Sequence, residues 1–213
     1  MANVLVIGAS RGIGLKTVEF ALAKGHNVRA FARSADRINM RHDNLEHFQG
    51  NALNAEDVQP ALHEIDVVVQ SLGVPLGPDL IIRPVTLFSK ATHVLISLME
   101  KSSARRLISV TGFGTGDSRK KIGPLQKVPF RLIFGRAYDD KSIQEDLIRR
   151  SKLAWTIARP VVLTNGSPTG RYQVLTEPID WRNGFISRAD VANFLTQQID
   201  HDGYVEKTPV LSY

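Results

Sequence analysis

The feature that most constrains this 213-residue chain is a run of three glycines near its N-terminus, spaced Gly8-x3-Gly12-x-Gly14. The run follows an apolar segment, Asn3–Ile7, and opens a segment with helical periodicity, Gly12–Lys24. In a strand-turn-helix unit of this kind, backbone N–H groups and the positive end of the helix dipole can hold a pyrophosphate. We therefore expect a phosphate-binding turn. It comprises Gly8, Ala9, Ser10, Arg11, Gly12, Ile13 and Gly14.

Apolar runs and helical segments alternate as far as Pro160, which predicts a parallel sheet covered by helices on both faces. The expected fold class is α/β, a Rossmann-type doubly wound parallel sheet. We expect strands at Asn3–Ile7, Asn27–Ala32, Leu45–Gln49, Val67–Ser71, Arg106–Thr111, Trp155–Ala158 and Pro209–Ser212. We expect helices at Gly12–Lys24, Ala55–Leu62, Thr86–Lys101, Asp140–Arg150 and Arg188–Ile199. The Gly-, Pro- and Lys/Arg-rich stretch before Asp140 is expected to be irregular.

The chain is long enough for one substantial core and too short for two, so residues 1–213 are expected to form a single domain. From Thr164 onward, glycines and prolines interrupt the alternation. They are Gly166, Pro168, Gly170, Pro178 and Gly184. We expect residues 164–213 to contribute a small C-terminal lobe on the substrate side.

Composition excludes several classes of function. The absence of cysteine excludes disulfide frameworks and thiolate metal sites, and the six histidines form no recognisable set of metal ligands. We find no apolar run of about 18 residues and no secretory leader, so we expect neither membrane insertion nor secretion. The cytoplasm is the simplest expected location.

The net charge of +6 raises the question of a nucleic-acid partner. The basic residues are scattered, and their densest stretch lacks the interleaved aromatic side chains that stack on bases. That stretch comprises Arg119, Lys120, Lys121, Lys127, Arg131 and Arg136. We expect a solvated or substrate-facing loop and no nucleic-acid binding.

The glycine run also satisfies a second pattern, Gly8-x-Ser10-x-Gly12, the nucleophile elbow of α/β-hydrolases. An elbow serine needs an oxyanion-hole loop from an earlier strand, and only seven residues precede Gly8. The elbow also leaves Gly14 without a role. The dinucleotide-binding interpretation is therefore favoured.

The residues after the second expected strand indicate which dinucleotide binds. NAD-specific Rossmann domains carry an acidic side chain there, about 20 residues beyond the glycines, whereas this chain has Arg33 and Ser34. A carboxylate repels a 2′-phosphate, but Arg33 can pair with it bidentately and Ser34 can donate a hydrogen bond. Arg11 can reach the same phosphate from the glycine turn. NADP(H) is the expected cofactor, and the alternative is that Arg33 is an ordinary surface arginine.

Further segments carry a family resemblance. They are Gly50-Asn51-Ala52-Leu53, Ser71-Leu72-Gly73, Ser109-Val110-Thr111-Gly112, Arg159-Pro160-Val161-Val162-Leu163-Thr164-Asn165-Gly166 and Ser187-Arg188-Ala189-Asp190-Val191-Ala192. In order and spacing, over nearly the whole length, the chain resembles the atypical short-chain dehydrogenase/reductases, which include NmrA-like and biliverdin-reductase-B-like proteins.

The resemblance implies a role for each segment. The implied contacts are Asn51, Ala52 and Leu53 with the adenine, Ser71, Leu72 and Gly73 with its ribose, Val110, Thr111 and Gly112 with the nicotinamide, and Pro160, Val161 and Val162 with the carboxamide. Asn51 stands where the family usually has Asp. Ser187 or Asp190 is expected to cap a helix.

The catalytic residues that the resemblance implies are Lys141, Thr111 and Tyr138. Family members that reduce carbonyls use a tyrosine as general acid and a lysine four residues later. The separation here is three, which turns the side chains about 100° apart relative to that arrangement, so Tyr138 does not simply inherit the acid's role. Lys141 is expected to bind the nicotinamide ribose, unless it is a solvent-facing lysine paired with a neighbouring carboxylate. Thr111 supplies a hydroxyl unless the family's serine aligns with Gly112.

Two functions are compatible with these residues. The first is an NADPH-dependent reductase that transfers hydride to a small carbonyl, quinone or flavin acceptor. The second is a non-catalytic NADP(H)-binding redox sensor, which the missing Tyr-x3-Lys pair favours. We prefer the reductase. Trp181, Phe185 and Tyr172 either line an acceptor pocket or pack the lobe against the sheet.

Overall fold

The structure, a computed structural model, describes residues 1–75, 77, 83–121 and 123–213, with only the backbone described for 124–133. Across these residues the main element is an eight-stranded sheet. In spatial order its strands are β3 (Leu45–Gln49), β2 (Asn27–Ala32), β1 (Asn3–Ile7), β4 (Val67–Gln70), β5 (Arg106–Val110), β6 (Ala154–Pro160), β10 (Val210–Ser212) and β8 (Gln173–Leu175). Neighbouring strands run parallel except for β10 and β8. The order from β3 to β6 is that of doubly wound dinucleotide-binding folds, so the predicted fold class is confirmed.

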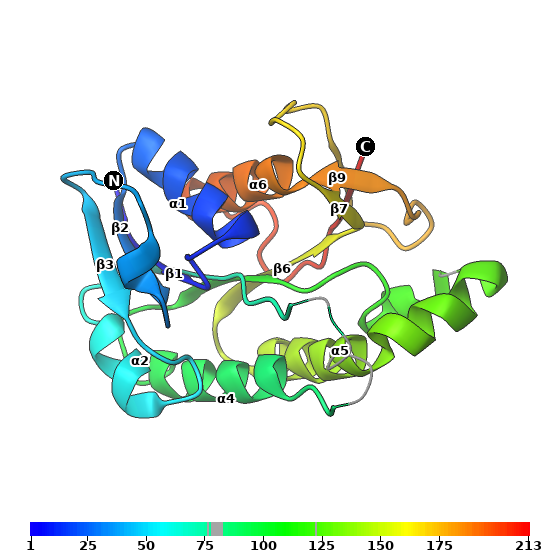
Figure 1. Cartoon of the computed structure of the whole chain (residues 1–213), viewed down its shortest axis with the longest axis horizontal. Helices are drawn as coiled ribbons and strands as arrows, with labels where there is room; N and C mark the ends of the chain where they lie inside the picture. The colour runs from blue at the N-terminus through cyan, green and yellow to red at the C-terminus, as the bar shows by residue number, and fades with distance from the viewer. Residues whose placement is uncertain (76, 78–82, 122) are drawn as a thin grey trace.

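Helices cover both faces of the sheet (Figure 1). They are α1 (Gly12–Ala23) and α6 (Arg188–Asp200) on one face, and α2 (Ala55–Ala61), α4 (Leu87–Met99) and α5 (Pro124–Arg150) on the other. In β1, Val4 and Val6 join the core under α1 and α6, while Leu5 and Ile7 join the core on the opposite face. A strand covered on both faces needs an apolar residue at every position, which explains the uninterrupted apolar run.

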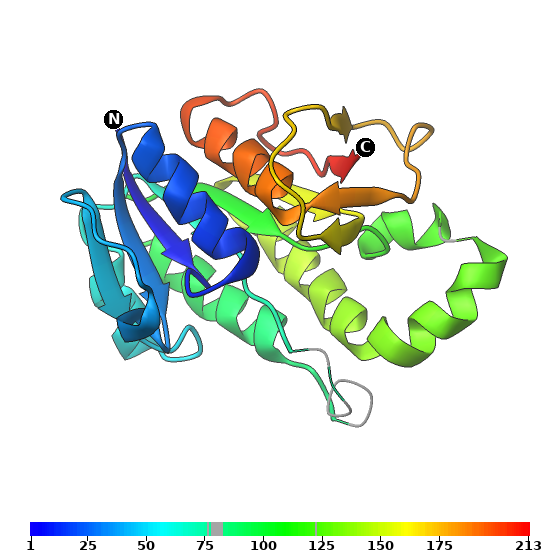
Figure 2. The ribbon, with the colours of Figure 1, turned by 45° about the horizontal axis from the view of Figure 1, so that its top comes forward.

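The chain between β5 and the end of α5 departs from the prediction. Instead of an irregular stretch up to Asp140, it forms a short 3-10 helix, η2 (Gly116–Lys121), and then the 27-residue α5. Pro124 lies in the first turn of α5, where a missing N–H costs no hydrogen bond. The proline content therefore overstated the irregularity of this segment. In Figure 2 the first half of α5 extends away from the sheet.

The chain after β6 is divided between two sheets. Two three-residue strands, β7 (Val162–Thr164) and β9 (Phe185–Ser187), pair in parallel apart from the main sheet, whereas β8 and β10 extend the main sheet. The prediction included β10 but missed β7, β8 and β9, which are too short to show a periodicity. Ser187 then caps α6 by accepting a hydrogen bond from the N–H of Asp190, which confirms the predicted cap.

Candidate functional site

The glycine turn lies where β1 passes into α1, and two of its glycines occupy places that no larger residue fits. A β-carbon on Gly8, whose φ is +91°, would lie 2.5 Å from the carbonyl oxygen of Ser71 at the end of β4. A β-carbon on Gly14 would lie 2.2 Å from the carbonyl oxygen of Gly8. Because these two residues have no side chain, the first turn of α1 packs closely against the ends of β1 and β4. A dinucleotide-binding turn depends on this close packing.

The N-terminus of α1 is also suited to an anion. Arg11, which precedes the helix, makes no capping hydrogen bond, and the first turn contains no acidic residue. By contrast, Asn54 caps α2, and Asp140 of α5 accepts hydrogen bonds from the N–H groups of Phe88 and Ser89 at the start of α4. Because the first N–H groups of a helix need acceptors, an external anion complements α1.

The predicted ligands of the 2′-phosphate lie at the surface where β2 ends. Arg33 and Arg11 are exposed, and Ser34 is half-buried at the start of a 3-10 helix, η1 (Ala35–Arg37). Among the described residues, neither guanidinium group forms an ion pair or a hydrogen bond. Both guanidinium groups are therefore available to a phosphate.

The segment predicted to contact the adenine forms a tight turn after β3. The side-chain oxygen of Asn51 accepts from the N–H of Leu53 (3.1 Å), and the N–H of Asn51 donates to Asp57 (2.8 Å). Ala52 is buried in the core, whereas the Leu53 side chain is exposed. The turn thus presents the apolar side chain of Leu53 at the same edge of the sheet as the glycine turn.

The three residues after β4 lie in different surroundings. The N–H of Ser71 donates to the carbonyl of Ile7 (2.9 Å), which places its backbone against the glycine turn. Leu72 packs against the buried side chains of Phe88 and Ala137. Apart from Gly73 and its chain neighbours, no atom of the described residues lies within 4 Å of the point where a β-carbon on Gly73 would lie.

Lys141 does not face solvent as the alternative interpretation required. Its Nζ donates to the carbonyls of Thr111 (2.9 Å) and Val110 (3.3 Å) and lies 4.4 Å from the ring centroid of Phe88. Burial lowers the pKa of Lys141 to about 8, although neighbouring carboxylates, chiefly Glu145, act in the opposite direction. The ammonium group is thus held at the carboxyl end of β5, the edge at which doubly wound sheets bind ligands.

Tyr138 packs directly on Gly112, just beyond the end of β5. A β-carbon on Gly112 would lie 2.8 Å from the Tyr138 hydroxyl, so the missing side chain makes room for the phenol. Tyr138 and Lys141 therefore both reach the residues that end β5, in spite of their three-residue separation. Burial raises the pKa of Tyr138 to about 12. The phenol stays protonated at neutral pH and is a weaker acid than an exposed tyrosine.

The Thr111 hydroxyl belongs to a buried polar network. It donates to Glu145 Oε1 (2.7 Å), and Glu145 forms a two-point ion pair with Arg159 (3.0 and 2.5 Å). Asp117 lies 2.6 Å from the Arg159 guanidinium, which also stacks over Trp181 (5.2 Å to the ring). This geometry commits the Thr111 hydroxyl to Glu145. Sequence reasoning missed the pair, and the one available signal was a charged residue, Arg159, inside an otherwise apolar strand.

The segment predicted to hold the carboxamide continues from β6 into β7. The N–H groups of Val161 and Val162 donate to the carbonyls of Leu211 and Gly184 (3.2 Å each), and the carbonyl of Pro160 accepts from Phe113. Val161 is buried, whereas the Val162 side chain is 50% exposed. Both N–H groups therefore already have acceptors within the protein. At this segment the exposed group is the side chain of Val162.

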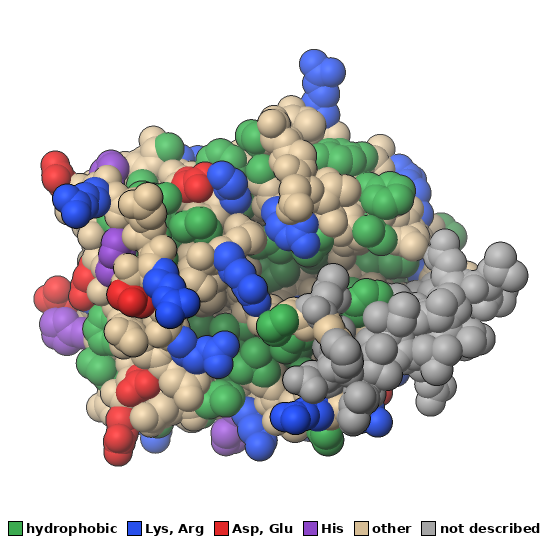
Figure 3. Space-filling model, in the orientation of Figure 1, with side chains coloured by type: hydrophobic (Ala, Val, Ile, Leu, Met, Phe, Trp, Pro, Cys, Tyr) green, Lys and Arg blue, Asp and Glu red, His purple; other side chains and the backbone are tan. Residues whose placement is uncertain are grey.

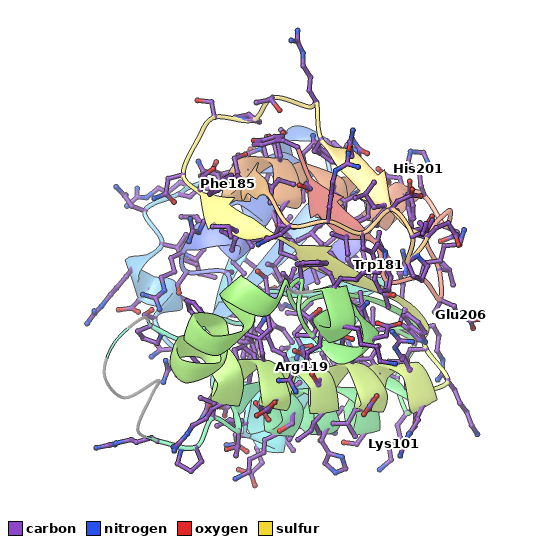
Figure 4. All side chains as sticks on the ribbon, turned by 90° about the vertical axis from the view of Figure 1, so that its right-hand side faces the viewer. Lys101, Arg119, Trp181, Phe185, His201 and Glu206 are labelled. Atoms are coloured by element: carbon purple, nitrogen blue, oxygen red, sulfur yellow. The ribbon has the colours of Figure 1, made fainter. Side chains whose placement is uncertain are left out.

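Two of the three aromatic residues that the sequence singled out after β6 are packed, and one is exposed. Trp181 is buried and donates its indole N–H to Leu175 (3.1 Å), and Tyr172 packs edge-on against Phe194. Phe185 is 61% exposed, and in Figure 4 it lies well apart from Trp181. Trp181 and Tyr172 therefore pack the lobe, while Phe185 is at the surface.

Lys and Arg side chains gather around a hollow in the middle of the face seen in Figure 3, the face on which the turn between β1 and α1 lies (Figure 1). In the dense basic stretch, Arg119 (labelled in Figure 4) forms an ion pair with Asp139 of α5, and the side chains of Lys127 and Arg131 lie outside those described. A second surface hollow, of about 470 Å³, lies between the C-terminal ends of α2 and α4, at the opposite edge of the sheet. Ligands of doubly wound sheets bind at the carboxyl edge, so we place the site at the glycine turn.

Over the part of the chain that the structure describes, no three His, Asp or Glu side chains are grouped so that they could hold a metal ion. Within the same residues, no helix has the length and apolar character needed to cross a membrane.

The fold and this edge define a dinucleotide-binding protein of the Rossmann class. A sequence profile of the NAD(P)H-binding family matches residues 8–202, and the chain belongs to that family. The predicted resemblance to atypical short-chain dehydrogenase/reductases is thereby confirmed.

Solved structures of the same class superpose on nearly the whole chain. ChuY, an anaerobilin reductase from Escherichia coli O157:H7, is 27% identical with a TM-score of 0.82, covering 99% of this chain and 96% of ChuY. A short-chain dehydrogenase/reductase from Veillonella parvula in complex with NADP has a TM-score of 0.84 at 16% identity, covering 100% and 94% of the two chains. That likeness shows the fold alone. In sequence, the uncharacterized protein YwnB of Bacillus subtilis is 26% identical over 204 residues, 92% of this chain and 91% of YwnB.

Proposed function

We propose that this protein is an NADPH-dependent reductase that transfers hydride to a small, electron-poor acceptor. The observation that carries the proposal is the position of Lys141, whose ammonium group is held by the carbonyls of Val110, the last residue of β5, and Thr111, the next residue, at the same sheet edge as the glycine turn. A lysine there can donate to the hydroxyls of a nicotinamide ribose and so orient the ring toward an acceptor. The likeness to ChuY, itself a reductase, supports the same activity.

The residues present fit NADP(H). The turn at Gly8 and Gly14 excludes side chains, and the N-terminus of α1 lacks a side-chain cap, so a pyrophosphate can complete it. Arg33 stands exposed where an NAD-binding domain carries a carboxylate. When bound, NADPH supplies the hydride, and the protein supplies position and electrostatics.

The proton donors at this edge favour acceptors of one chemical class. Reduction of an isolated carbonyl needs a general acid for the developing alkoxide, but the Thr111 hydroxyl is committed to Glu145, and burial makes Tyr138 a weak acid. A quinone, a flavin or another conjugated acceptor delocalises the negative charge and takes its proton from water. We therefore infer a conjugated acceptor in preference to a simple aldehyde or ketone.

Replacing Lys141 with methionine is expected to lower kcat/KM by roughly 10- to 100-fold, the effect of losing a charge-assisted hydrogen bond of about 1.5–3 kcal/mol. The same change removes a largely desolvated charge from contact with Phe88, so the free energy of unfolding should not fall. Steady-state kinetics and urea unfolding of the variant measure both effects. A parallel loss of stability and activity would indicate a structural lysine.

The pH dependence gives a separate test of Lys141. Its pKa of about 8 means that the ammonium donor is present below pH 8 and is lost as the pH rises through that value. We expect kcat/KM to fall over that range, and Lys141→Arg, which stays charged, should move the fall to higher pH. An unchanged profile in the arginine variant would assign the titration to another group.

A non-catalytic NADP(H) sensor is the second candidate. The commitment of Thr111 to Glu145 and the raised pKa of Tyr138 favour it, because neither group is prepared for proton transfer.

One titration distinguishes the two candidates. NADPH and NADH are added to the purified protein and followed by fluorescence, and quinones, flavins and aldehydes are then added while the absorbance of reduced nicotinamide is recorded. Oxidation of bound NADPH by a conjugated acceptor is the expected result. Tight binding without oxidation by any acceptor would favour the sensor, and no binding would overturn both candidates.

A further inference from the structure

Arg188, the first residue of α6, reaches across to the glycine turn. Its Cδ and Nε lie 3.8 and 4.0 Å from the point where a β-carbon on Gly12 would lie. α1 and α6 pack side by side on the same face of the sheet, so the two helix starts meet at this point (Figure 1). A cation from the C-terminal lobe thus stands beside the turn that binds phosphate in the proposed function.

The partners of Arg188 are neutral. Its Nη1 donates to the carbonyl of Thr164 (3.1 Å), the last residue of β7, and to the side-chain oxygen of Asn165 (2.7 Å), the residue after it. Among the described residues, no carboxylate forms an ion pair with Arg188. The two bonds orient the guanidinium fork and leave its charge uncompensated.

The surroundings favour an anion at this point. The guanidinium is half-buried, and a partly desolvated cation without a counter-ion is costly. The start of α1 beside it has no side-chain cap and no acidic residue, so its N–H groups and dipole add positive potential to the same space. The Arg188 guanidinium and the N-terminus of α1 therefore both create positive potential beside the glycine turn.

We propose that Arg188 binds the pyrophosphate of the dinucleotide, on the side opposite the glycine-turn N–H groups, and links the Thr164–Asn165 segment to bound cofactor. This assignment rests on the proposed NADP(H) binding and adds a residue from the lobe to that site. The planar guanidinium group of Arg188 can donate to two phosphate oxygens at once. Cofactor binding then orders the Thr164–Asn165 segment at the end of β7, the strand that begins with the exposed Val162.

The test compares two ligands, NADPH and adenosine 2′-monophosphate, which carries the 2′-phosphate but no pyrophosphate. Arg188→Gln is expected to weaken NADPH binding by about tenfold or more and to leave adenosine 2′-monophosphate unchanged. Arg188→Lys, which keeps the charge without the fork, should fall between the wild type and Arg188→Gln. The matched control is Arg150→Gln, an exposed arginine in the last turn of α5, which removes the same charge at the opposite edge of the sheet.

Hydrogen exchange supplies a second readout. NADPH should slow amide exchange around Thr164–Asn165 in the wild type and not in Arg188→Gln at matched saturation. Equal NADPH affinity in wild type and Arg188→Gln, or an equal loss for both ligands, would overturn the assignment while leaving the proposed function intact. A wild-type protein that binds neither ligand would overturn the proposed function and this assignment together.

Discussion

Replacing Glu145 with alanine is expected to lower the free energy of unfolding by about 3–5 kcal/mol, because it removes the buried counter-ion of the buried Arg159. Arg159 is fully buried and donates to both carboxylate oxygens of Glu145. The change also removes the acceptor of the Thr111 hydroxyl and one of the acceptors of the Thr115 hydroxyl. Asp117 remains near Arg159 but is half-exposed, so solvent screens it. Urea unfolding followed by circular dichroism measures the effect.

Two further variants make the result specific. Asp146→Ala removes a carboxylate from the neighbouring, exposed position of α5 and should change stability by less than about 0.5 kcal/mol. The double variant Glu145→Leu with Arg159→Met should recover much of the loss, since apolar residues of similar size can replace a buried ion pair. A cost of less than about 1 kcal/mol for Glu145→Ala would contradict the idea that this pair is tightly coupled.

The ion pair between Glu145 and Arg159 also affects the position of Lys141 in the candidate site. Glu145 lies one helical turn beyond Lys141 on α5, and its hydrogen bond to Thr111 joins α5 to the end of β5. The carbonyls that hold Lys141 belong to Val110 and Thr111. We therefore expect Glu145→Ala to weaken the placement of Lys141 as well as the stability of the fold.

Replacing Arg33 with aspartate is expected to shift the preference for NADPH over NADH by on the order of 100-fold or more. The variant loses the charge-assisted hydrogen bonds that Arg33 gives to the 2′-phosphate, worth about 1.5–3 kcal/mol each, and adds a repulsive carboxylate. NADH should bind as well or better, because an acidic residue after β2 accepts from the ribose hydroxyls. The dissociation constants of both cofactors, measured by fluorescence titration at fixed salt, give the ratio.

The control for this variant is Arg150→Asp, which makes the same change of charge at the far edge of the sheet. It should lower both affinities slightly and equally through the long-range field. If Arg33→Asp also weakens NADPH and NADH equally, Arg33 is an ordinary surface arginine, and the preference for NADPH has another origin.

The central part of the fold was predictable from the sequence because its signals are local. The strand Asn3–Ile7 and the glycine turn after it lie within 14 consecutive residues, and a strand buried on both faces shows itself as an apolar run. The prediction was wrong over residues 124–139, where Gly and Pro suggested a loop. There Pro124 occupies the first turn of a helix, and propensity alone does not distinguish that position from a breaker.

By itself the sequence determined the class of this protein: a doubly wound sheet that opens with a dinucleotide-binding turn. Only the tertiary structure decided the partners at the site. Glu145 meets Arg159 and Thr111, Arg188 meets the glycine turn, and Tyr138 packs on Gly112. Each of these contacts joins different elements, and the chain offers many acids and bases of similar local context. Burial and strand order select among them, because a buried charge is tolerated only where packing brings it a partner.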